Sequence, residues 1–250
     1  MPRLRVGSQI VQCEGIVLDK DGTITDFERL WLAMNLKRID LLQGWLQFGP
    51  HVRSALVKTM GLDPEKGRID SRGPVALAPR LYNMTAFTTV LYQHGIHWDE
   101  AWARVQEAFA EADRTLDMDR ALAPLPGVIE RLKLLREAGF RLALATSDNR
   151  HTTDLVLKRL ALDGWFEAIA TGDRVTNPKP HPEMILQVAS GMGLEPGRLI
   201  MVGDGITDVQ MGRNAGTALS VGVLSGLAGA DELGRYAHVI VESMLELEPA

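Results

Sequence analysis

Cysteine and surplus positive charge are what this 250-residue sequence most lacks. Cys13 is the only cysteine, so the chain can form neither an intrachain disulfide nor a thiolate zinc site, and a reducing compartment is favoured. The 27 Lys and Arg are outnumbered by 32 Asp and Glu, for a formal net charge of −5. Domains that bind nucleic acid or anionic membranes usually carry excess positive charge. We therefore expect a small-molecule or neutral protein partner, and neither nucleic acid nor membrane.

Long apolar runs are also missing. An uncharged stretch at 214–230 has 17 residues and is interrupted by four glycines, whereas a membrane-spanning helix needs about 20 mostly apolar residues. Arg3 and Arg5 lie near the N-terminus, but the apolar run of a secretory signal does not follow them. These absences predict a cytoplasmic protein.

Aromatic residues are few and unevenly spread. The chain has 5 Trp, 3 Tyr and 6 Phe, and ten of these 14 lie between residues 27 and 109. Apolar side chains recur there at helical spacing, as in Phe27, Leu30, Trp31 and Met34. Residues 63–79 are rich in Gly, Pro and charge and predict a long loop. The interval therefore predicts a helical insertion with its own small core.

Outside this interval the pattern changes to short apolar runs that alternate with amphipathic helical stretches. Continuous apolar strands alternating with helices are typical of a parallel sheet covered on both faces. We expect an α/β domain built from residues 1–25 and 123–250, interrupted by a helical domain at 26–122. The expected strands are at 15–18, 141–145, 168–170, 199–202 and 218–221, and the expected helices are near 127–138, 150–162, 182–193 and 206–215.

Charged and hydroxyl side chains gather where these strands should end. In an open parallel sheet, ligands bind beyond the carboxyl ends of the strands. Crowded carboxylates need a cation to neutralise them, and oxygen ligands without His or Cys suit Mg²⁺. With a lysine, a hydroxyl and backbone N–H groups at helix starts, such a site suits a phosphoryl group. The residues at these positions are Asp19, Asp21, Thr146, Ser147, Lys179, Asp204 and Asp208.

Four short motifs resemble those of the haloacid dehalogenase superfamily, in that family's order. DKDGT at 19–23 resembles the first motif, and the threonine that ends LALAT at 142–146 resembles the second. KPHPE at 179–183 resembles the third motif, and GDGITD at 203–208 the fourth. The resemblance spans most of the chain and implies a Rossmann-like catalytic core. The insertion matches the family's C1-type helical cap domain.

The resemblance also implies roles for the first and third motifs. Asp19 would be the nucleophile and a Mg²⁺ ligand. Asp21 would be the general acid and base, and would offer its backbone carbonyl to the metal. Lys179 would neutralise charge on Asp19 and on the phosphoryl group.

The second and fourth motifs would complete the site. Thr146 and the backbone N–H groups near Ser147 would bind the phosphoryl oxygens. Asp204 would bind the metal directly, and Asp208 would do so directly or through water. An acid in the first turn of a helix is also favoured by the helix dipole, so Asp208 has a structural interpretation as well.

Two positions depart from the family's common pattern. Lys20 occupies a place that is usually apolar and adds a charge near the site. Thr25, Asp26 and Phe27 replace the Asp-Ser/Thr pair often seen in phosphoglycolate phosphatases. The second departure weakens any assignment of phosphoglycolate as the substrate.

The resulting hypothesis is a Mg²⁺-dependent phosphatase of small phosphorylated metabolites, similar to phosphoglycolate phosphatases and working through an aspartyl-phosphate. Asp21 favours phosphate-ester chemistry, because the family's dehalogenases and phosphonate hydrolases lack a carboxylate there. A phosphomutase of the β-phosphoglucomutase type uses the same pair of aspartates and stays open, as does pyrophosphate hydrolysis. A non-catalytic binding or regulatory protein with this fold is the alternative from another class. The motifs leave the oligomeric state open.

Overall fold

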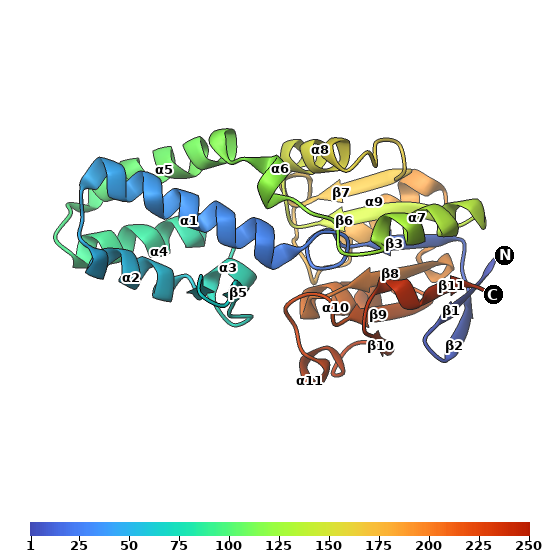
Figure 1. Cartoon of the computed structure of the whole chain (residues 1–250). Helices are drawn as coiled ribbons and strands as arrows, with labels where there is room; N and C mark the ends of the chain where they lie inside the picture. The colour runs from blue at the N-terminus through green and yellow to red at the C-terminus, as the bar shows by residue number, and fades with distance from the viewer. The chain divides into compact units, whose positions relative to one another are not determined.

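The computed structural model describes all 250 residues, which form two compact units. The first consists of Met1–Asp26 and Pro124–Ala250, and the second of Phe27–Ala123. We call the first the sheet unit and the second the helical unit, after the elements that dominate each (Figure 1). No helix has both the length and the apolar character needed to cross a membrane.

A parallel sheet of six strands forms the centre of the sheet unit, in the order β10-β9-β8-β3-β6-β7. β3 and β8 lie side by side in its middle (Figure 1). The parallel α/β sheet expected from the alternating apolar runs is thus confirmed. The strands are β3 (Gly15–Leu18), β6 (Arg141–Thr146), β7 (Ala168–Thr171), β8 (Leu199–Gly203), β9 (Leu219–Val223) and β10 (Val239–Val241).

Different helices cover the two faces of this sheet. Neighbouring residues of a strand point to opposite faces, so the contacts of successive residues show which helix lies on which face. Ile16 and Leu18 belong to one apolar cluster with Leu132 of α7. Val17, between them, belongs to a second cluster with Met184 of α9 and residues of α10. The helices of the unit are α7 (Val128–Glu137), α8 (Arg150–Arg159), α9 (Glu183–Met192), α10 (Ile206–Ala215) and the short α11 (Ala230–Leu233).

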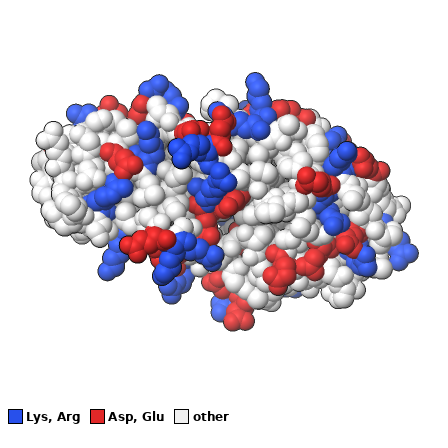
Figure 2. All heavy atoms as spheres, in the orientation of Figure 1, with Lys and Arg blue, Asp and Glu red and all other residues white.

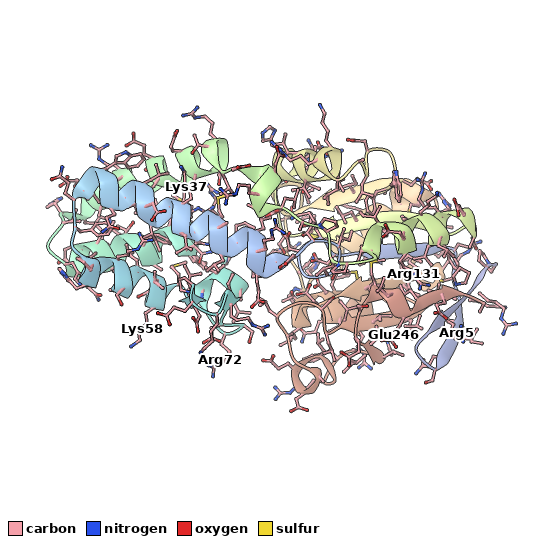
Figure 3. All side chains as sticks on the ribbon, in the orientation of Figure 1. Arg5, Lys37, Lys58, Arg72, Arg131 and Glu246 are labelled. Carbon is pink, nitrogen blue, oxygen red and sulfur yellow. The ribbon has the colours of Figure 1, made fainter.

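A small antiparallel sheet brings the two chain ends together, as Figure 1 shows. It contains β1 (Arg3–Val6), β2 (Gln9–Gln12) and β11 (Leu247–Pro249). Leu4 and Val6 are buried and alternate with exposed arginines. Arg131 of α7, labelled in Figure 3, donates a hydrogen bond to the Leu247 carbonyl oxygen at 3.1 Å. The sequence reasoning missed this sheet, since four residues are too few for a clear alternating pattern.

The helical unit is built mainly from three long helices. Its core includes an edge-to-face pair between Phe87 and Phe109, with ring centroids 5.3 Å apart. Lys58 and Arg72 project outward from it (Figure 3). Charges of both signs are interspersed over the face drawn in Figure 2. The helices are α1 (Phe27–Leu46), α2 (Pro50–Thr59), α3 (Pro74–Leu77), α4 (Arg80–Gln93), α5 (Trp98–Thr115) and α6 (Met118–Ala121).

The segment expected to be one long loop at 63–79 is more ordered than that. β4 (Leu62–Asp63) and β5 (Arg68–Ile69) form a two-stranded antiparallel hairpin, and α3 follows it. Buried Leu62 and Ile69 are opposite each other in the hairpin. The prediction of a loop without secondary structure was therefore wrong, because two apolar side chains suffice to fix a short hairpin against the rest of the unit.

Candidate active site

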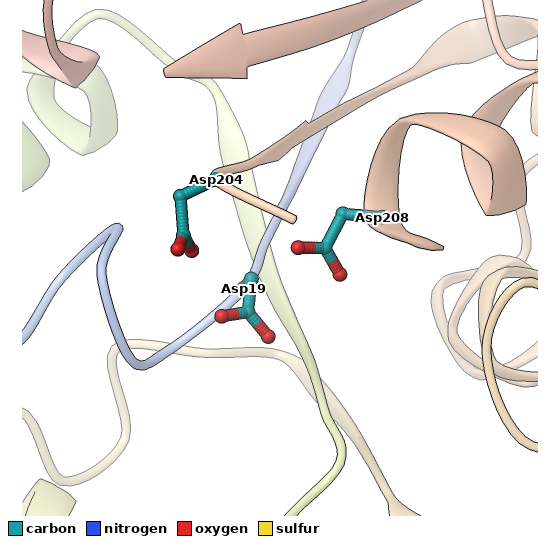
Figure 4. A group of neighbouring side chains, drawn as sticks. All are labelled: Asp19, Asp204 and Asp208. Carbon is teal, nitrogen blue, oxygen red and sulfur yellow. The ribbon is translucent and has the colours of Figure 1, made fainter. Parts of the chain in front are cut away.

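Three carboxylates meet at the carboxyl edge of the central sheet. Asp19 follows β3 directly, Asp204 follows β8, and Asp208 lies in the first turn of α10. The Asp19 N–H donates to the Val202 carbonyl oxygen of β8 at 2.9 Å, so the two strand ends are tied together. One carboxylate oxygen from each aspartate lies within 4.8 Å of the others, and all three residues are buried (Figure 4). The parallel pairing of β3 with β8 produces this cluster from residues 185 positions apart.

Lys179 is the cation that the structure places in this cluster. Its Nζ lies 2.5 Å from Asp19 Oδ1 and 2.6 Å from Asp208 Oδ1, and its side chain is only 4% exposed. Burial alone would lower the pKa of Lys179, but the neighbouring carboxylates of Asp19 and Asp208 raise it above its ordinary value. The ammonium group therefore stays charged between the two aspartates.

Burial, together with crowding, changes the pKa values of the carboxylates. Burial raises the pKa of Asp19 to about 7, with the charge on Asp208 adding to the rise and the Lys179 ammonium opposing it. Burial also raises the pKa of Asp204, and the charges on Asp19 and Asp208 raise it further. Charge in this pocket is therefore costly without a cation, beyond Lys179, to compensate it.

Asp204 is enclosed by two glycines from different loops. A Cβ on Gly22, whose φ is +87°, would lie 2.3 Å from Asp204 Oδ2, and one on Gly226 would lie 1.9 Å from it. The Leu227 N–H donates to the same oxygen at 3.3 Å. Ser225 Oγ donates to the Gly22 carbonyl oxygen at 2.8 Å and so joins the two loops. No larger side chain could occupy either glycine position without displacing the carboxylate.

Asp208 combines a structural contact with a contact in the site. Its Oδ2 accepts a hydrogen bond from the Gly205 N–H at 3.0 Å, at the start of α10. Its Oδ1 faces Lys179. A Cβ on Gly203 would lie 2.4 Å from the Asp208 Cβ, so the close approach of strand and helix requires glycine there. One oxygen of Asp208 thus makes the structural contact expected in the first turn of a helix, and the other contacts Lys179 in the site.

Asp21 is held by other partners than the three clustered aspartates. Thr25 Oγ1 donates to Asp21 Oδ1 at 2.7 Å, and Lys20 Nζ lies 2.5 Å from Asp21 Oδ2. Lys20 Nζ also lies 3.1 Å from Asp148 Oδ2. The cluster of Asp19, Asp204 and Asp208 does not include the Asp21 carboxylate.

The loop after β6 carries the other two predicted residues. Thr146 ends β6, which pairs with β3, and it is buried. Its Oγ1 accepts a hydrogen bond from the Asp148 N–H at 3.2 Å. Ser147 is exposed, and a Cβ on Gly172 would lie 2.3 Å from its carbonyl oxygen. The glycine lets the loop after β7 support the loop that contains Ser147.

Sequence reasoning missed Asp148 and the loop at 224–229. Asp148 lies two residues beyond Thr146, and the loop follows an expected strand with glycines at 226 and 229. Reading every strand end, and not only those with a family motif, would have found both. With them the site holds five carboxylates and two lysines, a net charge of −3 when all are ionised. The aspartates are Asp19, Asp21, Asp148, Asp204 and Asp208, and the lysines are Lys20 and Lys179.

This site agrees with the relationships of the chain. The sequence model of the haloacid dehalogenase-like hydrolases matches residues 13–216, which is most of the protein and includes all four motifs. The chain belongs to this family. Membership was the expectation drawn from the motifs, and it is confirmed.

Two proteins of known name resemble parts of this chain. Pyrophosphatase PpaX of Bacillus velezensis is 35% identical over 130 residues, covering 52% of this chain and 60% of the relative. Phosphoglycolate phosphatase of Agrobacterium fabrum is 35% identical over 127 residues, covering 51% of this chain and 54% of the relative. The chain thus spans between half and two thirds of these relatives in the matched regions.

A solved structure supports the fold over nearly the whole chain. The crystal structure of a predicted phosphoglycolate phosphatase from Haemophilus somnus 129pt superposes with a TM-score of 0.68. The match covers 93% of this chain and 95% of that structure, at 19% identity. At this identity the likeness shows a common fold.

Proposed function

We propose that this chain is a Mg²⁺-dependent phosphatase of small phosphorylated metabolites. The observation that carries the proposal is the Asp19 carboxylate at the end of β3, 2.5 Å from the buried Lys179 ammonium and beside two further buried carboxylates. Relatives named as phosphatases, acting on pyrophosphate or phosphoglycolate by their names, support the same chemistry.

The Asp19 carboxylate is the proposed nucleophile. An oxygen of Asp19 attacks the phosphorus of the ester, the bond from phosphorus to the ester oxygen breaks, and an aspartyl-phosphate forms. Asp21 gives its proton to the departing alkoxide and then removes a proton from the water that attacks the aspartyl-phosphate. Asp19 and inorganic phosphate are released, and Asp21 is protonated again.

The remaining residues bind and neutralise. The Lys179 ammonium offsets negative charge on Asp19 and on the phosphoryl oxygens. Thr146 and the backbone N–H groups near Ser147 are proposed to donate to those oxygens, since they lie at the carboxyl end of β6, the neighbour of β3. The positions of these groups at adjacent strand ends support this assignment.

The donor set suits Mg²⁺. Asp19, Asp204 and Asp208 offer only hard oxygen ligands, with no His or Cys among them. Asp19, Asp204 and the backbone carbonyl of Asp21 are proposed to hold the ion directly, and Asp208 directly or through water. When bound, Mg²⁺ would neutralise carboxylate charge and polarise a phosphoryl oxygen. The net negative charge of the site supports a divalent cation.

The helical unit is proposed to act as a cap domain that selects the substrate. All seven predicted site residues belong to the sheet unit, so the chemistry needs no residue of the helical unit. Residues 26–122 are then left to recognise the leaving group. The expected small-molecule partner and a cytoplasmic location stay predictions.

A panel of phosphate compounds tests the proposed function. The purified chain with Mg²⁺ would be given phosphoglycolate, pyrophosphate, a sugar phosphate and p-nitrophenyl phosphate, and released phosphate would be measured. We expect release from at least one compound, and none from the Asp19→Asn variant. Transfer to the sugar phosphate without phosphate release would instead indicate a phosphomutase. A chain that neither releases nor transfers phosphate would contradict the proposal.

A further inference from the structure

Lys20 is a charged side chain that is completely buried beside the active-site aspartates. It lies between Asp19 and Asp21 in the sequence. Its exposure is 0%, and it is among the largest fully buried side chains of the protein. Burying an ammonium group is costly unless carboxylates pair with it. A residue of this kind is retained only where its partners compensate for the burial.

Two carboxylates from different loops meet the Lys20 ammonium. Nζ lies 2.5 Å from Asp21 Oδ2 and 3.1 Å from Asp148 Oδ2. Asp148 belongs to the loop after β6 and lies two residues beyond Thr146. Lys20 therefore links the loop after β3 to the loop after β6 through a side chain that is completely buried.

The other oxygen of Asp21 is held as well. Thr25 Oγ1 donates to Asp21 Oδ1 at 2.7 Å. The Thr25 N–H donates to the Lys20 carbonyl oxygen at 3.0 Å, which fixes the turn carrying all three residues. With one donor on each oxygen, the plane of the Asp21 carboxylate has a single favoured orientation. Lys20 provides the charged one of these two donors.

We propose that Lys20 is a positioning residue, which fixes the orientation of the Asp21 carboxylate by holding it against the Asp148 loop. The proposal rests on the proposed function, in which Asp21 transfers protons. General acid and base groups act only within hydrogen-bond reach of the atom that they protonate. Because Lys20 has no exposed surface, it acts through Asp21 and makes no contact with the substrate.

Removal of Lys20 should therefore slow the hydrolysis of one class of substrate more than that of another. Without the ammonium group, Asp21 Oδ2 loses its donor and its link to the Asp148 loop, so the Asp21 carboxyl group can rotate away from its position. An alkyl phosphate needs a proton on its leaving alkoxide, whereas p-nitrophenolate leaves without one. Loss of a well-placed general acid lowers the rate by about 10²–10⁴-fold. Misplacement of the acid should lower the rate by part of that factor.

The experiment compares kcat/KM for an alkyl phosphate and for p-nitrophenyl phosphate in Lys20→Met and in wild type. This parameter reports the steps up to departure of the leaving group. We expect the alkyl phosphate to lose at least about tenfold more than p-nitrophenyl phosphate. Asp148→Asn, which retains Lys20 and the side-chain shape, should show the same selectivity to a smaller extent. If Lys20→Met does not fold, Asp148→Asn provides the test.

Lys133→Met is the matched control, since Lys133 lies on α7 and its side chain is 67% exposed. It should leave the ratio of the two kcat/KM values unchanged. Equal losses on both substrates, or no loss, in folded Lys20→Met would overturn the positioning role. A selective loss in Lys20→Met without one in Asp148→Asn would overturn the part assigned to Asp148. A wild-type chain inactive on both substrates would instead overturn the proposed function, and this inference with it.

Discussion

Each unit of the molecule buries charge, but the two do so in opposite ways. In the helical unit, the Arg38 guanidinium carbon lies 3.9 Å from the centroid of the Phe109 ring, and Arg38 Nη2 donates to Asp113 Oδ1 at 3.3 Å. In the sheet unit, three buried carboxylates lie close together, and the Lys179 ammonium pairs with only two of them, Asp19 and Asp208. Arg38 is matched by an aromatic face and an acid, whereas the aspartates are crowded beyond what their lysine neutralises.

The difference separates a structural use of buried charge from a functional one. A paired and stacked guanidinium is stabilising or neutral for the fold. Like charges brought together in a buried site destabilise the fold, and they persist where a reaction or a bound ion requires them. Burial first, and then this crowding of like charges, raise the pKa of Asp19, to about 7, and the pKa of Asp204. No comparable crowding of acids surrounds Arg38.

The largest effect should come from Asp19→Asn. The amide cannot attack phosphorus, so turnover of every ester should fall below detection. The same change removes one of the crowded charges, so the melting temperature at about pH 8 should stay equal or rise. Activity on p-nitrophenyl phosphate and thermal unfolding would be measured on one preparation. Persistent turnover would exclude Asp19 as the nucleophile, and a strongly destabilised variant would show that Asp19 also stabilises the fold.

Mg²⁺ should stabilise the chain, and more so at higher pH. The pKa of Asp19 is raised in the folded chain, so without metal its contribution to stability is greatest below the unfolded pKa and is lost as pH rises through about 7. The proposed Mg²⁺ would bind the ionised carboxylates more tightly than the protonated ones. A free Mg²⁺ concentration of 100 times Kd would stabilise the folded chain by about 2.7 kcal/mol. The rise in melting temperature on adding Mg²⁺ should therefore be larger at about pH 8 than at about pH 6.

Asp204→Asn is the control for this measurement, because it removes a proposed ligand and leaves Lys179 paired with Asp19 and Asp208. The variant should lose most of the Mg²⁺-dependent rise. An equal rise in both proteins would mean that the ion acts elsewhere, and the contrast between the two units would lose its functional meaning.

Much of the sheet unit could be predicted from the sequence, for a physical reason. Strands buried on both faces are continuous apolar runs, and Asp19 and Asp204 each follow such a run directly. Their proximity follows from parallel pairing alone. The contacts of Lys20 could not be predicted, because they depend on how two loops approach each other, 128 residues apart in the chain. The contact of the loop at 224–229 with Asp204 could not be predicted for the same reason, although the position of that loop after an expected strand could be.

The helical unit was predicted less completely. The aromatic spacing indicated helices and a separate core, but the hairpin of β4 and β5 rests on four residues and shows no pattern of its own. Arg38 also interrupted the apolar repeat of α1, as a charged residue in an otherwise inward-facing row. Its burial depends on Phe109 and Asp113, which are far along the chain in α5. Helical periodicity alone gives no sign of such partners.

Arg38→Met should reduce stability and leave the chemistry intact. The change removes the stacking on Phe109 and the bonds to Asn35 and Asp113, which together should destabilise the fold by about 1–2 kcal/mol. The melting temperature should fall by about 2–8 °C for a chain of this size. Turnover of p-nitrophenyl phosphate below the melting range should change by less than about threefold.

Arg114→Met is the matched control, since its side chain is 73% exposed and pairs only with Glu111. It should melt within about 1 °C of the wild type. If Arg38→Met abolished turnover in a folded protein, the buried charge of Arg38 would be needed for catalysis. The distinction between structural charge in the helical unit and functional charge in the sheet unit would then be wrong.

The smallest expected effect concerns His238, a titratable group of the sheet unit away from the carboxylate cluster. Burial, and then the charge of Arg213, lowers its pKa, and the Ser220 N–H donates to its Nδ1 at 2.9 Å near the amino end of β9. Only the neutral ring accepts this bond. Its contribution to stability is therefore present above the unfolded pKa, near 6.5, and is lost as pH falls through the lower folded value.

His238→Asn tests this contribution, because the asparagine oxygen lies at the same branch position as Nδ1 and can accept from Ser220 without titrating. Melting temperatures of wild type and variant would be compared at about pH 8 and about pH 5.5. The fall on acidification should be smaller in the variant, by no more than about 2 °C, since His238 is exposed. The crowded aspartates titrate identically in both proteins and cancel in the comparison. An equal fall in melting temperature in both proteins would show that titration of His238 does not affect stability. The pKa shifts that affect the stability of the sheet unit would then be confined to the cluster around Asp19.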